Sequence, residues 1–409
     1  MNLPNKSPSF IKTYLRYSAA HAVVSAALSC LKRINSLDRK VVSLRPKGSS
    51  QGRVLISYLV EPFVFKPDQP ILSSHTRYWE ALQVVKTFLD FGYDVDVISC
   101  NNNGFTPRRD YAFFVDTRFN FERIAPLLNK GCMKILHGET AHMLFHNAAG
   151  SKRLLALYER RGVTLHVRRW ERSIKAIEYA DYITIYGNAF TVGTYLNTGK
   201  PLFPLPISTT VLQPWPTSKD FDACRGRFLW FGSGGMVHKG LDLVLEAFAG
   251  MPECCLTVCG PVQKEKDFVQ AFYKELYETP NIHTVGWVDT QSIKFREITT
   301  SCMGLVYPSC SEGQSGAVVE CLHAGLIPII SRESGVDVND FGTALETCSI
   351  EEIRNAVRMV SHLPAQELQK MARAAWEFAR ANHTRERFAE EYRKVIAQII
   401  ARPVLMTTK

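Results

Sequence analysis

The fold of this 409-residue chain is decided by residues 303–330, MGLVYPSCSEGQSGAVVECLHAGLIPII. The first part, residues 303–307, is an apolar run that is typical of a buried parallel strand. A polar turn with glycines follows, then a predicted helix of small residues that Gly325 ends, and residues 326–330 predict the next strand. A strand–loop–helix–strand unit of this kind places its loop at the carboxyl edge of an open sheet, where α/β proteins bind ligands.

Two glutamates lie in this unit, Glu312 in the loop and Glu320 inside the predicted helix, with seven residues between them. The backbone amides of residues 315–317 begin the helix, and amides at a helix start bind anions. An anion site that faces two carboxylates suits a ligand with both phosphates and many hydroxyls, such as a nucleotide sugar. The alternative is structural, with one glutamate in a surface loop and the other on a helix face.

The composition is that of an ordinary globular protein, 46% hydrophobic and 22% charged, and the length is enough for two domains. The net charge of +10 is concentrated at the N-terminus, since residues 1–50 carry nine Lys and Arg against Asp38 alone, a net of +8. The rest of the chain is therefore close to neutral. It has no stripe of aromatic and basic residues and no zinc-finger spacing, so we exclude nucleic acid as a partner.

The eleven cysteines are scattered along the chain, and no CxxC pair occurs. Most of them lie in apolar runs, where cysteine behaves as a small hydrophobic side chain. The pattern predicts neither a disulfide framework nor a zinc site, and it favours a reducing, cytoplasmic location.

Residues 1–50 form a basic leader, for which the pattern predicts an amphipathic helix. Apolar residues recur near helical spacing over residues 11–34, with Lys and Arg at both ends. The uncharged core, residues 17–31, is shorter than the roughly 20 residues that cross a bilayer. Two interpretations stay open: a helix on an anionic inner membrane surface, which would make the protein peripheral on that membrane, or a helix that docks on the protein itself.

From Arg53 onward the sequence alternates between strand and helix patterns, which predicts two doubly wound α/β domains. In the first, strands are predicted over residues 54–60, 92–99, 111–115, 133–137 and 182–186, with helices from Ser74 and over 121–129, 151–161 and 170–179. In the second, strands are predicted over 227–232, 256–259, 282–285, 303–307 and 326–330, with helices over 241–248, 264–277 and 291–301. Three helices are predicted to end the chain, over 351–361, 365–380 and 385–400.

Residues 201–216 contain five prolines and are predicted to be the linker between the domains. We expect an N-terminal Rossmann-like domain over residues 51–205 and a C-terminal one over 206–382, facing each other across a cleft. The last segment, 383–409, is expected to be a helix that packs back on the N-terminal domain.

A second candidate site is the glycine-rich turn 232–240, GSGGMVHKG, between a predicted strand and a predicted helix. Glycines let backbone amides approach a phosphate closely, and Lys239 would neutralise its charge. The turn is neither a P-loop nor a Rossmann dinucleotide fingerprint, because no Ser or Thr follows the lysine and GxGxxG is not completed. By itself a purely structural turn is an equal alternative, but together with Glu312 and Glu320 it is the favoured diphosphate site.

These motifs resemble those of family 4 glycosyltransferases, and they occur in the same order along the chain. The matching segments are residues 232–240, 260–261, 285–288 and 308–330. The family's pattern of Glu, seven residues, Glu, and then a small residue, Gly and Pro is matched by Glu312, Glu320, Ala324, Gly325 and Pro328. The resemblance covers roughly residues 53–400. It implies the GT-B fold of two facing Rossmann-like domains, with the donor in the C-terminal domain and the acceptor in the N-terminal one.

The resemblance also implies a role for each matched residue. Glu312, a catalytic candidate, would lie beside the transferred sugar, and Glu320 would hold the ribose hydroxyls. Lys239, also a catalytic candidate, would bind the diphosphate. The other donor-binding candidates are Gly234, Gly235, Ser315, Gly316, Trp287 and Val288.

An arginine that the family usually carries just after the strand is absent, because Ser233 or Gly234 stands at its position. The backbone amides of Gly234 and Gly235 therefore become more important as candidate phosphate ligands. The pairs at 160–161 and 168–169, all arginines, could meet an anionic or lipid-phosphate acceptor, but solvated helix ends are the favoured interpretation.

His137 closes a predicted strand of the first domain. The resemblance implies a histidine here that points into the cleft, so we take it as a catalytic candidate; a histidine bonded within a turn is an equal alternative. The acceptor-side candidates are His137 and, from the loop 70–75, Ser73, Ser74 and His75, with Glu139 and His142 as weaker ones.

The activity that the resemblance implies is transfer of a sugar, with retention of configuration, from a nucleotide-diphosphate donor to a glycan or lipid-linked acceptor. No cofactor is expected. No metal-binding pair of aspartates is visible in the sequence, and this fold class generally works without a metal. Two alternatives stay open: an epimerase or phosphorylase on the same fold, or a non-catalytic subunit that binds sugar nucleotides and is anchored by its leader.

Overall fold

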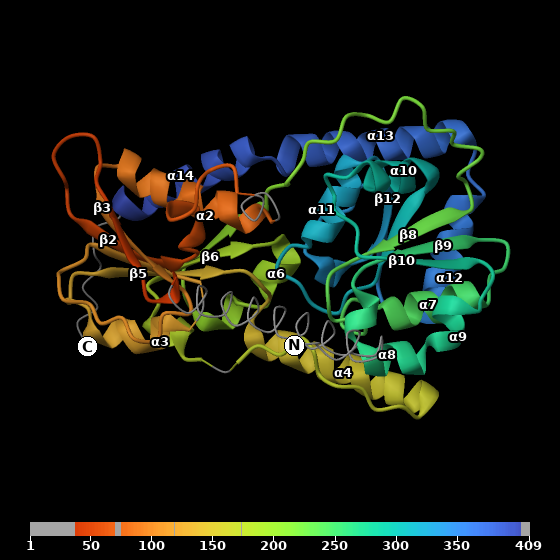
Figure 1. The fold of residues 1–409 in the computed structure, drawn as a ribbon, viewed down its shortest axis with the longest axis horizontal. Coiled ribbons are helices and arrows are strands. Elements are labelled where there is room, and N and C mark those ends of the chain that lie inside the picture. The colour runs from red at the N-terminus through yellow and green to blue at the C-terminus, as the bar shows by residue number, and fades with distance from the viewer. Residues whose placement is uncertain (1–36, 70–74, 118, 173, 402–409) are drawn as a thin grey trace, which may run out of the picture.

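The computed structural model describes residues 37–69, 75–117, 119–172 and 174–401. These residues form two α/β domains that lie side by side, each built on one mostly parallel sheet (Figure 1). The predicted fold class, two doubly wound α/β domains, is confirmed. The greater part of the basic leader, residues 1–36, lies outside the described residues.

The N-terminal sheet has seven strands in the order β1-β3-β2-β4-β5-β6-β7, all parallel except β1. The strands are β1 Val41–Leu44, β2 Arg53–Tyr58, β3 Asp94–Ser99, β4 Phe113–Asp116, β5 Met133–Gly138, β6 Tyr182–Tyr186 and β7 Leu202–Leu205. The helices are α2 Thr76–Asp90, α3 Asn120–Ile124, α4 Met143–Arg161, α5 Ala176–Tyr179 and α6 Ala189–Gly193. Separate apolar clusters cover the two faces, one under α2 and one under α3 and α5.

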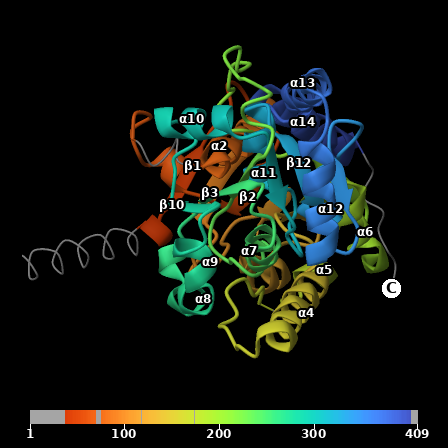
Figure 2. The ribbon, with the colours of Figure 1, turned by 90° about the vertical axis from the view of Figure 1, so that its right-hand side faces the viewer.

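The C-terminal sheet has six parallel strands in the order β10-β9-β8-β11-β12-β13. The strands are β8 Arg227–Phe231, β9 Cys255–Cys259, β10 Ile282–Gly286, β11 Gly304–Tyr307, β12 Ile327–Ser331 and β13 Thr343–Leu345. The helices are α7 Leu241–Ala249, α8 Lys266–Ala271, α9 Tyr273–Tyr277, α10 Ile293–Ser301, α11 Gly316–His323, α12 Ile350–Ser361, α13 Ala365–Asn382 and α14 Arg385–Ala401. Helices α10, α11 and α13 lie on one side of the sheet, and α7, α9 and α12 lie on the other (Figure 2).

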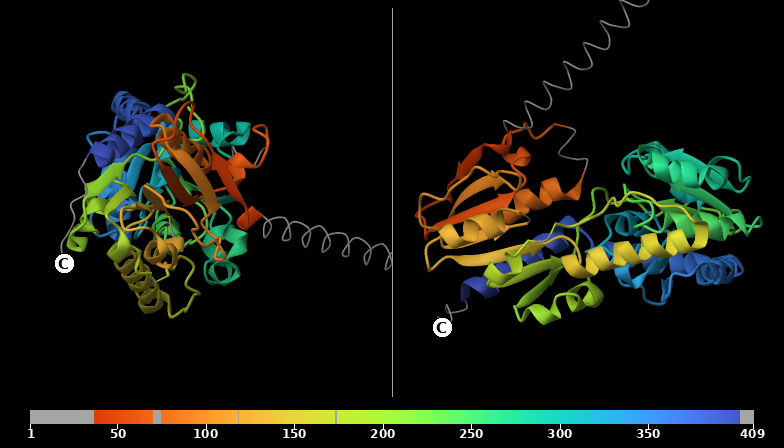
Figure 3. Two further views of the ribbon diagram at one scale, coloured as in Figure 1. Left: turned by 90° about the vertical axis from the view of Figure 1, so that its left-hand side faces the viewer. Right: turned by 90° about the horizontal axis from the view of Figure 1, so that it is seen from below.

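One helix from each domain packs against the other domain. Leu157 of α4 is fully buried in the C-terminal core, although α4 follows a strand of the N-terminal sheet. Conversely, α14 packs on α2, and its Phe388, Tyr392 and Ile396 belong to the N-terminal core. The right panel of Figure 3 shows α4 running along both domains. The segment that follows α4, residues 162–172, is thereby held beside the C-terminal domain.

Several segments differ from the sequence predictions: α6 and β13 were not predicted, and the helix predicted over 264–277 is divided into α8 and α9. Residues 41–44 were expected in a helical leader but form β1, whose alternating exposure suits an edge strand paired with β3. Residues 202–205 lie in the expected linker but form β7, where exposed Pro204 is tolerated because the strand is at the sheet edge. Of the helix expected over 170–179, only α5 is formed, since the backbone of Glu171 is bonded to the Asn147 side chain instead.

Candidate functional site

A cavity of about 310 Å³ lies between the domains, where the carboxyl ends of the two sheets face each other. We name it the main cavity because both domains line it. Three of the lining residues come directly after strands: Glu139 follows β5, Gly232 follows β8 and Trp287 follows β10. The N-terminal domain contributes His75, Thr76, Arg77, Glu139, Arg169 and Tyr186. The C-terminal contribution includes Gly232, Ser233, Lys239, Trp287, Val288, Glu312, Ser315, Gly316, Ala317 and Glu320.

A buried ion pair of Glu312 and Lys239 forms the floor of the cavity. Lys239 Nζ lies 2.6 Å from Glu312 Oε1 and donates to the Tyr307 hydroxyl at 2.7 Å, and that hydroxyl donates to the same carboxylate oxygen at 2.9 Å. The side chains of the ion pair are only 5% and 9% exposed. The structure thus brings together two residues that the sequence assigned to separate motifs.

The charge state of Glu312 follows from its neighbours. Burial by itself would raise the pKa of the carboxyl, but the positive charges of Lys239 and Arg169, and the neighbouring His238, lower it well below its ordinary value. Burial lowers the pKa of Lys239, and the charge of Glu312 opposes this shift. Glu312 is therefore ionised at neutral pH, which suits stabilisation of positive charge rather than proton donation.

Glu320 lines the cavity, and one of its two carboxylate oxygens has no partner among the described residues. Its Oε1 accepts from the Thr210 amide at 2.8 Å and from the Thr210 hydroxyl at 2.7 Å. Its Oε2 is buried and has no hydrogen-bond partner among the described residues. Burial raises the pKa of this carboxyl, and the Thr210 hydrogen bonds oppose that shift. A ligand hydroxyl is the natural partner for an acceptor of this kind.

The start of α11 offers backbone donors beside these carboxylates. Ser315 is the N-cap, and its hydroxyl accepts from the Val318 amide at 3.5 Å. The first amides of a helix have no partner within the helix. Those of Gly316 and Ala317, both of which line the cavity, are therefore suited to an anion.

The glycine-rich turn is arranged differently from the prediction. The Gly235 amide donates to one oxygen of Glu265 at 2.5 Å, and the Met236 amide donates to the other at 3.2 Å. Gly232 and Ser233 line the main cavity, whereas Gly234 and Gly235 do not. The Gly235 amide is already bonded to a carboxylate of the protein, which does not favour its expected role as a phosphate ligand. The role of the Gly234 amide stays a prediction.

His137 lies in the N-terminal core and not on the cavity. Its side chain is packed among the rings of Tyr58, Tyr186 and Tyr392, with 1% of the residue exposed. Its Nδ1 is hydrogen-bonded to the Thr184 hydroxyl at 2.8 Å, and burial lowers the pKa of the ring to about 4. The geometry favours the structural alternative over a catalytic role.

The acceptor-side wall is built by the start of α2 and the end of β5. His75 is the N-cap of α2, since its Nδ1 accepts from the Arg77 amide at 3.2 Å. Arg77 forms a two-pronged ion pair with Glu139, at 2.6 and 2.8 Å. Sequence reasoning missed Arg77, which was signalled only by its place just after the loop 70–75. Of the other candidates, His142 caps α4 away from the cavity, and Ser73 and Ser74 lie outside the described residues.

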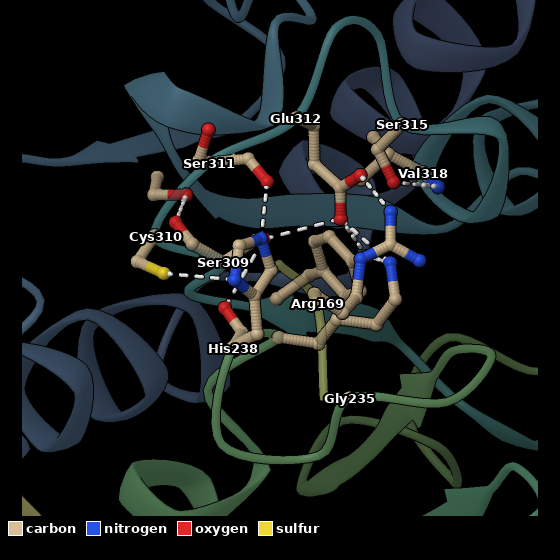
Figure 4. Close-up of polar contacts among 12 residues, drawn as sticks. Arg169, Gly235, His238, Ser309, Cys310, Ser311, Glu312, Ser315 and Val318 are labelled. Carbon is tan, nitrogen blue, oxygen red and sulfur yellow. Dashed lines mark hydrogen bonds and ion pairs between the residues drawn. The ribbon is translucent and has the colours of Figure 1, made fainter. Parts of the chain in front are cut away.

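Arg169 reaches the cavity from the segment that follows α4. Its guanidinium points toward Glu312, with Nη2 3.7 Å from Oε2 (Figure 4). The sequence pattern favoured a solvated helix end for Arg169, but Arg169 lies after the end of α4 and against the C-terminal domain. Trp287 and Val288 also line the cavity; Trp287 is 69% exposed, while Val288 is buried. The described part of the chain holds no cluster of His, Cys, Asp and Glu suited to a metal ion.

Comparisons with known proteins agree with this architecture. Residues 225–362 match the family model described as Glycosyl transferases group 1, so this part of the chain is similar to that family. No curated protein matches the chain.

Solved structures resemble the greater part of the chain. Sucrose-phosphate synthase from Thermosynechococcus elongatus superposes with a TM-score of 0.57 at 13% identity, covering 86% of this chain and 100% of that one. Anabaena HepE in complex with UDP and glucose gives 0.51 at 11% identity, covering 86% and 99%. TarM gives 0.51 at 11% identity over 71% of this chain, which spans only 55% of TarM. These likenesses show the fold, which is GT-B.

Proposed function

We propose that the protein is a retaining glycosyltransferase that moves a sugar from a nucleotide diphosphate to a glycan or lipid-linked acceptor. One observation carries the proposal: a single cavity holds an ionised Glu312, an unpartnered oxygen of Glu320, and cationic and amide groups for a diphosphate. The family match over the C-terminal domain supports glycosyl transfer. The complex of HepE with UDP and glucose supports a nucleotide-sugar donor.

We assign donor binding to the C-terminal domain. The Glu320 oxygen would accept from a ribose hydroxyl, and the exposed indole of Trp287 would stack on the base beside Val288. The amides of Gly316 and Ala317, with Lys239, would bind the diphosphate.

The reaction breaks the bond between the anomeric carbon and the diphosphate oxygen. The acceptor hydroxyl forms the new bond on the same face, and its proton passes to the departing phosphate oxygen. The ionised Glu312 would stabilise positive charge that develops on the sugar. We assign neutralisation of the leaving diphosphate to protein cations rather than to a metal ion, because cationic side chains already line its site.

The acceptor would enter along the N-terminal wall, where Arg77, Glu139 and His75 offer polar groups to its hydroxyls. None of the helices in the described ranges is long and apolar enough to cross a membrane. A cytoplasmic enzyme that reaches an anionic membrane surface through its basic leader is the location that we propose.

The test uses the purified full chain. UDP-glucose, UDP-N-acetylglucosamine, ADP-glucose and GDP-mannose are screened for a rise in melting temperature, since a bound ligand stabilises the folded state. Nucleoside diphosphate release is then measured with octyl glucoside as the hydroxyl acceptor, and the new anomeric configuration is read by NMR. Retained configuration supports the proposal. Isomerised or phosphorolysed sugar identifies the alternative enzymes, and binding without turnover identifies a non-catalytic subunit.

A further inference from the structure

Three cationic side chains line the main cavity among the described residues: Arg77, Lys239 and Arg169. Arg77 is committed to both oxygens of Glu139. Lys239 is almost fully buried and bonded to Tyr307 and Glu312. A ligand that carries two phosphates needs accessible N–H donors, and Arg77 and Lys239 have few N–H groups that are not already bonded.

Arg169 differs from the other two cations. Its side chain is 33% exposed, and its contact with Glu312, at 3.7 Å, is longer than a hydrogen bond. The forked N–H donors of its guanidinium are therefore available to a phosphate, whose geometry they match. Arg169 also lies near Lys239, because the two cations face the two oxygens of the same carboxylate, Glu312.

The backbone around Arg169 is fastened to both domains. Its carbonyl oxygen is hydrogen-bonded to His146 Nε2 of α4 at 3.1 Å. The preceding Arg168 pairs with Asp267 of the C-terminal domain, and the His166 amide donates to the same carboxylate at 2.9 Å. A guanidinium on a fixed backbone loses little freedom on binding, which favours affinity.

The glycine-rich turn makes room for this side chain. Gly235 has φ +91°, and a Cβ at this position would lie 2.6 Å from Arg169 Cδ and 2.7 Å from Cγ. Any larger residue would displace the arginine stem. The glycine that sequence reasoning assigned to phosphate contact by its own amide thus serves to seat an arginine.

We propose that Arg169 binds the diphosphate of the donor, so that a residue of the N-terminal half completes the anion site of the C-terminal domain. The inference rests on the proposed use of a nucleotide-diphosphate donor. A diphosphate held by Lys239, the α11 amides and Arg169 connects the two domains. Donor binding is therefore coupled to their docking.

Isothermal titration calorimetry of the full chain tests this. The probes are UDP, ADP and GDP, each compared with the nucleoside of the same base. Arg169→Gln removes the charge, Arg169→Lys keeps it without the fork, and Arg172→Gln is the matched control. Arg172 lies on the same segment, over the ring of Phe119, and does not line the cavity.

We expect Arg169→Gln to weaken binding of the nucleoside diphosphate about 10- to 100-fold, the loss typical of a charged hydrogen bond. Nucleoside affinity should change less than about twofold, as should all affinities of Arg172→Gln; Arg169→Lys should fall between. Unchanged diphosphate affinity in Arg169→Gln refutes the inference alone. An equal loss for nucleoside and diphosphate also refutes it, since the effect is then structural. A wild-type protein that binds none of the three diphosphates refutes the proposed function, and the inference with it.

Discussion

Lys239→Met removes the charge that pairs with Glu312 while keeping an unbranched apolar stem in the site. The two side chains are 5% and 9% exposed, and their charged atoms are 2.6 Å apart. Removing one partner of a buried pair leaves the other charge uncompensated, which costs about 3–5 kcal/mol. Arg169 still faces Glu312 at 3.7 Å. We therefore expect a loss at the low end, about 3 kcal/mol of unfolding free energy.

A second substitution separates this electrostatic cost from a simple packing defect. Glu312→Gln in the Lys239→Met background removes the stranded carboxylate, so the double variant should lose less stability than the two single variants together. Groups in direct contact commonly show interaction energies of about 0.5–3 kcal/mol. We expect about 2 kcal/mol here, because the pair is short and nearly dry.

Urea unfolding at pH 7, followed by circular dichroism, measures the wild type, the two single variants and the double variant. Tryptophan fluorescence is recorded in parallel, because a two-domain chain need not unfold in one step. Lys370→Met is the matched control. Its ion pair with Glu367 is exposed, so its loss should stay within about 0.5 kcal/mol. A cost below about 1 kcal/mol for Lys239→Met, or additive costs in the double variant, would refute the reasoning.

Three further predictions concern groups outside this pair. Burial raises the pKa of Glu80 from 4.5 to about 7, although its hydrogen bonds from Ser208 oppose the shift. The protonated carboxyl therefore stabilises the fold fully below pH 4.5, and about 3 kcal/mol of unfolding free energy is lost as the pH rises through 7. Urea titrations should show this loss in the wild type and not in Glu80→Gln. Trp287→Ala should cost about 1–3 kcal/mol of nucleoside affinity by calorimetry, with little change in melting temperature because the indole is 69% exposed; unchanged affinity would rule out base stacking. His137→Asn should lower the melting temperature yet keep turnover per folded molecule, and selective loss of turnover would restore the histidine to the catalytic set.

The parts of the site that could be predicted from sequence are those built by local rules. Glu312 and Ser315 lie between β11 and α11, Glu320 lies inside α11, and Lys239 lies between β8 and α7. Strand ends and helix starts of an α/β sheet meet at one edge, so spacing along the chain determines their neighbourhood. The meeting of Lys239 with Glu312 at 2.6 Å is the geometric result.

The parts that could not be predicted depend on contacts between distant segments. Nothing near Gly235 in sequence indicates that Glu265 occupies its amide. His137 ends a strand, as expected, but the rings that bury it come from β2, β6 and α14. The hydrophobic periodicity or a sequence motif indicates at which edge of the sheet a residue lies. The packing of other elements decides whether a ligand can contact that residue.

The placement of Arg169 follows from the helix exchange between the domains. Leu157 buries α4 in the C-terminal core, and Arg160 and Arg161 at its end pair with Asp242 and Glu275 of that domain at 2.7 and 2.8 Å. The segment after α4 is therefore attached to the C-terminal domain, with Arg168 and the His166 amide both bonded to Asp267. A search for a phosphate-binding arginine within the glycine-rich turn must miss one that arrives from α4. The absence of an arginine at 233–234 and the seat for one at Gly235 are two aspects of the same arrangement, in which the anion site is complete only while the domains are docked.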